Sequence, residues 1–224
     1  MRVDNPSSRL VIAIDGPAAA GKGTLARRIA EHYGLKYLDT GALYRAVGLA
    51  MLRAGLDPDD EAAAADIARK LDVSLLQDPE LRSIAAGNAA SQVARHKAVR
   101  AALLDFQRDF ACKAPNGAVL DGRDIGTVVL PHADVKLFIT ASPEVRARRR
   151  WLELGGEESG TPYEEVLRVV QERDARDASR VEAPMKPAED AHLLDTSELD
   201  IDAAFRAARR IIDARIEAAR DASV

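Results

Sequence analysis

The 224-residue sequence has one cysteine, no long apolar run and no excess of positive charge. Its single cysteine, Cys112, excludes an internal disulfide and is typical of a protein from a reducing compartment. No apolar run approaches the roughly 18 residues that a membrane span needs. The first nine residues also lack the apolar segment of a signal peptide. We therefore expect a cytoplasmic protein without a membrane partner.

The charge balance excludes another class of partner. The chain carries 32 basic and 36 acidic residues, for a formal net charge of −4, which argues against a generic nucleic-acid coat. Its 47% hydrophobic and 30% charged residues are ordinary for a soluble globular protein. The length fits one sizeable domain, or a core with a small insert. Because the sequence shows no heptad seam or long apolar strip, we expect a monomer.

Five short apolar runs predict buried strands. Continuous apolar runs, rather than alternating ones, are typical of strands buried on both faces. Helical patterns separate the runs, so the sequence predicts an α/β fold with a five-stranded parallel sheet between layers of helices. The runs are Leu10–Ile14, Tyr37–Leu38, Ala118–Leu120, Val135–Thr140 and Leu193–Leu194.

Residues 55–117 interrupt this alternation, because a simple connection between two strands needs far fewer residues. Asp57 and Pro58 predict the start of a helix with acidic residues in its first turn. Residues 72–84 have an extended, turn-punctuated character, and 91–113 have the pattern of one long helix. We predict a small α+β insert that packs on the main sheet.

The stretch GPAAAGKGT, residues 16–24, follows the first strand and precedes a helical pattern. This is the context in which the motif G-x-x-x-x-G-K binds phosphate. Small residues let backbone N–H groups converge on a phosphate, and the helix N-terminus adds unpaired donors and a partial positive charge. Lys22 supplies the counter-charge for the β- and γ-phosphates of a nucleotide. A glycine-rich turn with a surface lysine is the structural alternative.

The motif departs from its strict form directly after the lysine. Ser or Thr is expected there, whereas this chain has Gly23, with Thr24 one place later. The form GKGT is the one found in nucleoside monophosphate kinases. The departure weakens the expectation that a hydroxyl next to Lys22 holds Mg²⁺.

A second candidate motif is YLDTGALYR, residues 37–45. Thr40 can cap a helix that starts near Gly41, and Arg45 lies in its second turn. A helix N-terminus with an arginine one turn in predicts a second anion site. The alternative is a plain cap and a surface charge.

A third motif is LDGRDIG, residues 120–126. Asp121 follows a predicted central strand, where a P-loop enzyme keeps the acid that orients Mg²⁺ through its waters. Arg123 and Asp124 fall in a loop at the carboxyl end of the strands, where ligands bind in open α/β sheets. The two charges could instead pair with each other, but an exposed pair contributes only ~0–1 kcal/mol to stability.

Residues 146–180 predict a hinged flap, because two charged helices flank a Gly/Ser-rich break at 155–160. In the second helix, Arg173, Asp177 and Arg180 share one face, and Arg176 lies alongside. The first helix carries a similar stripe of Arg146, Arg149 and Arg150. Two solvated helices are the alternative, but beside a phosphate loop these arginines favour clamping of a phosphoryl group in transfer.

Taken together, six segments resemble bacterial cytidylate kinase, a nucleoside monophosphate kinase family of P-loop proteins. They are IAIDGPAAAGKGTLA, YLDTGALYRAV, GNAASQVA, DGRDIGTVVLPHADVKLFITAS, ERDARDASR and APMKPAEDAHLLDTS, within residues 9–216. The resemblance implies one P-loop kinase domain over residues 1–224, of three-layer α/β/α type. It also implies that residues 55–117 form a CMP-binding insert and residues 146–180 a helical lid.

The activity implied by the resemblance is that of a (d)CMP kinase. Such an enzyme transfers the γ-phosphoryl group of ATP reversibly to CMP or dCMP, with Mg²⁺, and gives ADP and CDP or dCDP. Carried over by position, the ATP-binding residues are Gly16, Pro17, Ala18, Ala19, Ala20, Gly21, Lys22, Gly23 and Thr24.

The acceptor site is also carried over residue by residue. Arg45, Arg123 and Arg180 would hold the acceptor phosphate. Arg173 and Asp177, with Thr40, would contact the pentose, and Ser91, Arg100 and Asp124 would recognise cytosine. The residues expected to neutralise charge during transfer are Lys22, Arg123, Arg173 and Arg180.

The cytosine assignment that the resemblance implies also makes chemical sense. Cytosine offers a donor at N4 and acceptors at N3 and O2, and a carboxylate that accepts from N4 is a known base-edge contact. Uracil would leave the carboxylate of Asp124 unpaired, and such a pocket can reject an analogue by up to ~10⁴–10⁵-fold.

The sequence departs from the family pattern at two places. Many members have Ser-Gly where this chain has Ala18 and Ala19, so one side-chain contact to phosphate is expected to be missing. Thr40 stands where Ser is common, which bears on the choice between ribose and deoxyribose. Two other functions stay open, namely a P-loop kinase with another small acceptor and a nucleotide-binding regulatory module that transfers no phosphate.

Overall fold

The computed structural model describes residues 9–221; residues 1–8, which the sequence predicts to hold no signal segment, and residues 222–224 lie outside this range. One sheet has the strand order β2-β3-β1-β4-β5, and every pairing in it is parallel. This confirms the predicted five-stranded parallel sheet. The strands are β1 Leu10–Asp15, β2 Lys36–Asp39, β3 Gly117–Gly122, β4 Val135–Thr140 and β5 His192–Asp195.

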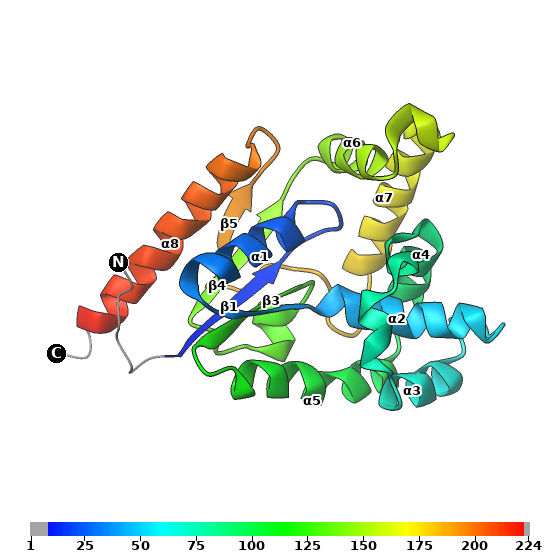
Figure 1. Ribbon diagram of the computed structural model, residues 1–224, viewed down its shortest axis with the longest axis horizontal. Helices are drawn as coiled ribbons and strands as arrows, with labels where there is room; N and C mark the ends of the chain where they lie inside the picture. Colours follow the sequence, from blue (N-terminus) through cyan, green and yellow to red (C-terminus); the bar gives the residue numbers. More distant parts are fainter. Residues whose placement is uncertain (1–8, 222–224) are drawn as a thin grey trace.

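Helices cover both faces of the sheet (Figure 1). Helices α1 (Lys22–Tyr33) and α8 (Ile201–Asp221) pack on the face to which Ile12 and Ile14 of β1 point. The intervening Ala13 points to the other face, where a second core contains residues of α2, α3, α4 and α5. Successive strand residues thus enter different cores, which explains why β1 is apolar throughout. The helices of the second core are α2 Thr40–Arg53, α3 Glu61–Arg69, α4 Ile84–Val93 and α5 Lys97–Lys113.

The expected α+β character of the insert is wrong. Residues 55–116, all of which the structure describes, contain helices and 3₁₀ turns but no strand. The turns are η1 (Val73–Gln77) and η2 (Pro79–Arg82). Asp72 and Asp78 each accept a backbone N–H two residues ahead, from Ser74 and Glu80. These side chains turn the backbone where the leucine pattern indicated an extended segment.

Two helix boundaries in the insert also differ from the prediction. Helix α3 starts after Asp60, whose side chain accepts from Ala63 N at 3.1 Å, rather than at Asp57. The single helix predicted over 91–113 is two helices, α4 and α5, separated by a turn at residues 94–96. His96 in that turn lies 2.9 Å from the carbonyl of Pro58, so a contact between distant segments sets the break.

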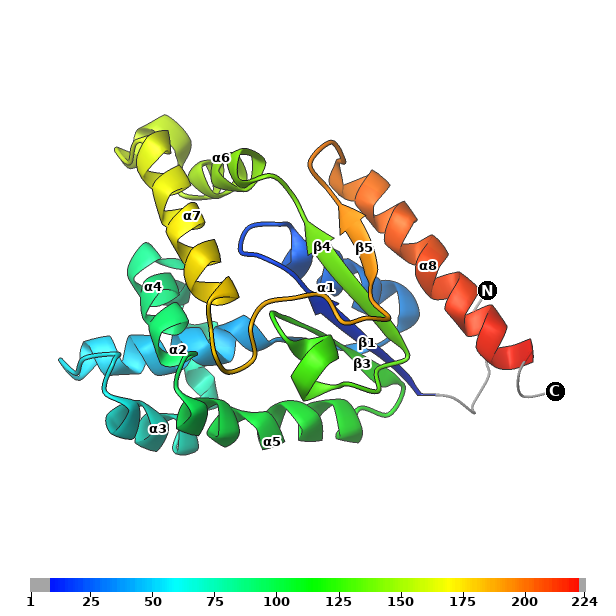
Figure 2. The same cartoon turned by 180° about the vertical axis from the view of Figure 1, so that it is seen from behind.

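The predicted break at residues 155–160 lies between α6 (Pro143–Glu153) and α7 (Tyr163–Ala178), with a short turn, η4 (Gly156–Ser159), between them. Gly155 and Gly160 have positive φ values of 107° and 68°, which favour glycine. A small core of its own, formed by Ala147, Val166 and Val170, joins the two helices. The pair stands beside α4 at the end of the molecule away from α8 (Figure 2).

Candidate active site

The phosphate loop, residues 16–21, connects β1 to α1. A β-carbon at Gly16 would lie 1.9 Å from the carbonyl oxygen of Ile139, so only glycine allows the backbone to pass β4 here. Gly21 caps α1 with φ at 83°. Ala19 also has a positive φ, 58°, a conformation that costs a non-glycine residue about 1–2 kcal/mol. The loop is therefore strained at Ala19, where many members of the family that the sequence resembles have glycine.

Lys22 begins α1 and is buried. Its Nζ donates to the carbonyl oxygen of Pro17 at 2.7 Å, so the ammonium group lies across the loop. Burial, followed by the charge of Arg123, lowers its pKa to about 7, although Asp121 and Asp39 oppose this shift. An incoming polyphosphate would replace the missing counter-charge and favour the ammonium form.

The lowered pKa of Lys22 predicts that binding of a polyphosphate to the loop takes up a proton above pH 7. The empty site loses the charge on Lys22 as the pH rises through about 7, whereas the bound phosphates hold it. The dissociation constant of a non-hydrolysable ATP analogue should therefore rise about fivefold between pH 7 and pH 8. Calorimetry in buffers of different ionisation enthalpy measures the proton uptake directly. Lys22→Arg keeps its charge and should lose the pH dependence, and binding at pH 8 without proton uptake would contradict the prediction.

Asp121 lies at the end of β3, facing the phosphate loop. Its Oδ1 accepts from the hydroxyl of Tyr37 at 3.0 Å, and its backbone oxygen accepts from Thr40 Oγ1 at 2.8 Å. Burial raises the pKa of this carboxyl to about 6, and nearby Asp39 raises it as well. Hydroxyl groups from β2 and α2 thus fix both the side chain and the backbone at this position.

The prediction that Thr40 caps helix α2 is wrong. The cap is Asp39, whose Oδ1 accepts from Ala42 N at 3.0 Å. Its Oδ2 accepts from Arg45 at 2.7 Å, so Arg45 is held beside the start of the helix as expected. Both Asp and Thr can cap helices, and local sequence did not show that Thr40 would bond to β3 instead.

Asp177 of α7 is the centre of an ionic cluster that joins three parts of the chain. Its side chain is 1% exposed and accepts from Arg123 Nε at 2.9 Å, from Ser91 at 3.1 Å and from Arg180. Ser91 belongs to α4, Arg123 follows β3, and Arg180 follows α7. The alternative in which Arg123 pairs only with its neighbour Asp124 is therefore not what the structure shows.

A second buried ion pair links the insert to the loop after β3. Arg100 of α5 donates to Asp124, and their side chains are 11% and 7% exposed. Arg100 also lies over the ring of Tyr44, 5.7 Å from its centroid. Burial raises the pKa of Asp124, while the charge of Arg100 opposes this shift. The pair presents an acceptor and a donor next to each other in a partly apolar setting.

Among residues 9–221, Arg173 has no acidic partner at hydrogen-bond distance. Its Nε is buried without a hydrogen-bond partner in the described chain. Burial lowers its pKa to about 9, and the charges of Arg123, Arg45 and Arg180 lower it further, against that of Asp177. A concentration of guanidinium groups with spare donors is suited to an anion that carries several negative oxygens.

The structure adds Asp15, which sequence reasoning missed. It ends β1, and its two carboxylate oxygens accept from the backbone N–H groups of Ile125 and Gly126, each at 2.7 Å. These residues begin a π-helical turn, η3 (Ile125–Val129), directly after Asp124. Asp15 therefore fastens the loop with Arg123 and Asp124 to the strand that enters the phosphate loop. An acid that closes an apolar strand just before Gly16 was the available signal.

The arginine stripe on α6 also contacts the phosphate loop. Arg146 is 3% exposed and pairs with Asp174 of α7, and its Nη1 donates to the carbonyl oxygen of Ala18 at 3.2 Å. The alternative of a solvated helix is thus wrong for this residue, which ties the two helices to the loop. Arg149 donates instead to the carbonyl oxygen of Thr196 at 2.7 Å.

One cavity of about 770 Å³ brings these groups together. All nine residues expected to bind the acceptor line it, as do Lys22, Asp121 and four more phosphate-loop residues, Ala18, Ala19, Gly23 and Thr24. The other four residues of the expected ATP site do not line it, namely Gly16, Pro17, Ala20 and Gly21. Nine basic and five acidic side chains surround the space. In a chain of net charge −4, this local positive excess indicates an anionic occupant.

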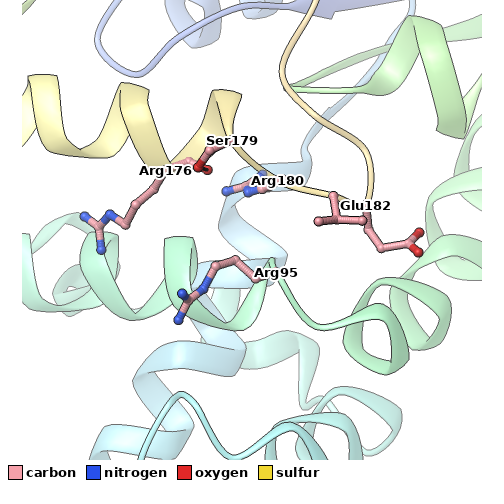
Figure 3. A pocket seen from close by; sticks show the side chains of 6 residues that line it. Arg95, Arg176, Ser179, Arg180 and Glu182 are labelled. Atoms are coloured by element: carbon pink, nitrogen blue, oxygen red, sulfur yellow. Dashed lines mark hydrogen bonds between the residues drawn. The ribbon is translucent and has the colours of Figure 1, made fainter.

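A smaller hollow of about 290 Å³ shares Arg180 with the main cavity. Arg95 and Arg176 reach into it from α4–α5 and α7, and the carboxylate of Glu182 is directed away from them (Figure 3). Arg95 is paired with Asp59, and Arg176 donates to Asn88 Oδ1 at 3.4 Å. The arginine cluster therefore continues from the main cavity to the surface.

Comparison with known proteins gives one consistent result. A family model described as cytidylate kinase matches residues 12–214. The cytidylate kinase of a Caulobacter species is 58% identical over 203 residues, which cover 91% of this chain and 94% of that protein. The cytidylate kinase of Rhodopseudomonas palustris is 58% identical over 207 residues, covering 92% of this chain and 96% of that protein.

A solved structure is similar in fold. The crystal structure of an uncharacterized protein from Eubacterium ventriosum superimposes on this chain with a TM-score of 0.53. The alignment covers 91% of this chain and 98% of the chain in the crystal structure. Because the two sequences are only 16% identical, this likeness concerns the fold alone.

Proposed function

The chain belongs to the cytidylate kinase family, and we propose that it performs the family's reaction in the 770 Å³ cavity. The reaction is reversible transfer of the γ-phosphoryl group of ATP to CMP or dCMP, which gives ADP and CDP or dCDP. One observation supports this location of the active site: residues of the phosphate loop, the Asp177 cluster and the Arg100–Asp124 pair line the same cavity. The two anionic substrates, and the base of the acceptor, can then bind within a single cavity.

We place ATP on the phosphate loop. The loop offers backbone N–H groups, the N-terminus of α1 and the ammonium group of Lys22. Lys22 must leave the carbonyl oxygen of Pro17 to reach a phosphate, and the negative charge of the nucleotide supplies the driving force. Ala18 and Ala19 contribute no side-chain donor, so the backbone and Lys22 carry the recognition of the phosphates.

The residues beside the loop fit Mg²⁺. This ion prefers oxygen ligands and usually keeps several waters, with one or two carboxylates and the phosphates of its nucleotide. Asp121 lines the cavity next to Gly23, and Asp39 lies nearby. We propose that Asp121 would hold the ion through water. When bound with ATP, Mg²⁺ neutralises charge on the phosphate oxygens.

The arginines around Asp177 are assigned to the acceptor. We propose that Arg45, Arg123 and Arg180 bind the phosphate of CMP, because each lines the cavity that the phosphate loop also lines. Arg173, with its unpartnered Nε, Asp177 and Thr40 are placed on the pentose side. Phosphoryl transfer needs alignment and charge neutralisation more than proton chemistry, and this cluster provides both.

The Arg100–Asp124 pair is assigned to the base, with Ser91 beside it. Its carboxylate can accept from N4 of cytosine, and its guanidinium can donate to N3 or O2. The two side chains are buried and paired with each other, so the structure holds these polar groups in a fixed orientation. Because all these residues come from one chain, we propose that the protein works as a monomer.

We infer that α6 and α7 act as a lid. Arg146 connects them to the phosphate loop, and the Asp177 cluster connects α7 to the acceptor side. Closure of the pair would bring the arginines toward the phosphates and exclude water, which would otherwise accept the phosphoryl group.

The proposed function is tested by measuring ADP formation from MgATP with CMP, dCMP, UMP, dTMP and AMP in parallel. Strong turnover with CMP and dCMP alone supports both the reaction and the base site. Equal turnover with UMP or AMP would overturn the assignment of Arg100 and Asp124 to cytosine. ATP binding without formation of ADP that depends on CMP would favour the regulatory module instead.

A further inference from the structure

The phosphate loop lacks a hydroxyl where the P-loop motif has one. Gly23 stands at the position after Lys22, where Ser or Thr would place a hydroxyl beside Mg²⁺. A β-carbon at Gly23 would lie 3.4 Å from the hydroxyl oxygen of Tyr37 and 3.9 Å from Oδ2 of Asp121. The missing side chain would therefore extend toward the space that the Tyr37 hydroxyl occupies.

Tyr37 reaches this position from β2, on the face of the sheet that α1 covers. β2 pairs with β3 in a register that sets Tyr37 opposite Val119 and Asp39 opposite Asp121. Because side chains two residues apart on a strand share a face, all four point toward α1. The Tyr37 ring packs with the core under α1, and the guanidinium of Arg27 lies 5.3 Å from its centroid. Arg27 is one helical turn after Gly23 and holds the ring from above.

The hydroxyl of Tyr37 is hydrogen-bonded to the acid at the end of β3. It donates to Oδ1 of Asp121 at 3.0 Å. With Oδ1 engaged, Oδ2 is the oxygen on the side of Gly23. Tyr37 does not itself line the cavity, whereas Asp121 does. The tyrosine thus orients the acid from behind.

We propose that Tyr37 is a positioning residue for the magnesium site. Its hydroxyl orients Asp121, and in this way it replaces the hydroxyl that a Ser or Thr side chain at position 23 would supply. This assignment rests on the proposed function, in which Asp121 holds the waters of Mg²⁺. A side chain at position 23 would lie in contact with the Tyr37 hydroxyl, 3.4 Å from its β-carbon, so a hydroxyl placed at position 23 would be next to the same carboxylate. Groups that orient a metal-binding carboxylate typically change metal affinity by 10–100-fold when they are removed.

The test measures how much Mg²⁺ is needed for nucleotide binding, with a non-hydrolysable ATP analogue and calorimetry. Tyr37→Phe should raise the half-saturating Mg²⁺ concentration by about tenfold. Its affinity for the analogue without Mg²⁺, and its affinity for CMP, should not change. A second hydroxyl in the double variant Gly23→Ser/Tyr37→Phe should restore most of the Mg²⁺ affinity.

Tyr33→Phe is the matched control. Tyr33 also donates its hydroxyl to a carboxylate, Asp213, at 2.6 Å, but this pair joins α1 to α8 away from the cavity. An unchanged Mg²⁺ requirement in Tyr37→Phe, or an equal rise in Tyr33→Phe, would overturn the proposal. If the double variant did not recover its Mg²⁺ affinity, the proposal that the Tyr37 hydroxyl replaces a hydroxyl at position 23 would be overturned. Failure of the proposed function would show differently, as absence of analogue binding in the unmodified protein.

Discussion

Replacement of Arg180 by alanine is expected to lower the turnover number for CMP by about 10³-fold or more. Arginines that stabilise charge on a phosphoryl group in transfer contribute on the order of 10³–10⁵ to the rate. Arg180 is suited to this role because its side chain is only 4% exposed and lines the same cavity as Lys22. Its Nε has no hydrogen-bond partner in the described chain, so donors are free for a phosphate.

The fold should survive this change. Asp177, which loses one donor, keeps the hydrogen bonds from Arg123 and Ser91. A thermal melt checks the fold, and steady-state kinetics with varied CMP separates turnover from binding. Arg168→Ala is the control, since Arg168 lies on α7, the helix that precedes Arg180, is 62% exposed and pairs only with Glu172 among the described residues. Near-normal turnover in a folded Arg180→Ala variant would remove Arg180 from the site.

The sequence predicted the parts of the site that depend on local pattern. An apolar strand, small residues and a helix define the phosphate loop, so its place between β1 and α1 follows from residues 9–34 alone. The placing of Arg173 and Asp177 on one face of a charged helix follows from helical spacing, whereas Arg180, predicted on the same helix, lies after the end of α7. These expectations succeed because the residues that make each feature are neighbours in the chain.

The parts that depend on contacts between distant segments were not predictable in this way. Thr40 bonds to the backbone of Asp121, 81 positions away, and leaves Asp39 to cap α2. Asp15 bonds to the backbone of residues 110 and 111 positions later. The turn between α4 and α5 contacts Pro58, in the loop before α3. In each case a polar group forms its hydrogen bond with a residue of another element. The local sequence around the polar group does not indicate which distant residue will be its partner.

Replacement of Asp124 by asparagine is expected to abolish most of the discrimination between cytosine and uracil. The carboxylate of Asp124 only accepts hydrogen bonds, so it suits the N4 amino group of cytosine and opposes O4 of uracil. An asparagine amide can turn its NH₂ group toward O4. We expect the ratio of kcat/KM for CMP over UMP to fall by at least about 10²-fold, with a rise in absolute turnover of UMP.

Stability must be separated from specificity in this experiment, because Asp124 is the buried partner of Arg100. Loss of one partner from a buried ion pair can cost about 3–5 kcal/mol, since the other charge stays uncompensated. The double variant Arg100→Gln/Asp124→Asn removes both charges and tests whether the fold tolerates a neutral pair. Asp59→Asn serves as the control, because it breaks the exposed pair with Arg95 in the same region.

The ratio of the two substrates decides the role of Asp124. A purely structural carboxylate would lower kcat/KM for CMP and UMP by the same factor when it is replaced, because both substrates need the same folded protein. A carboxylate that reads the base changes the two in opposite directions. An unchanged preference for CMP in a folded Asp124→Asn variant would show that cytosine is recognised elsewhere in the cavity, with Ser91 and the backbone of the loop after β3 as the remaining polar groups beside Arg100.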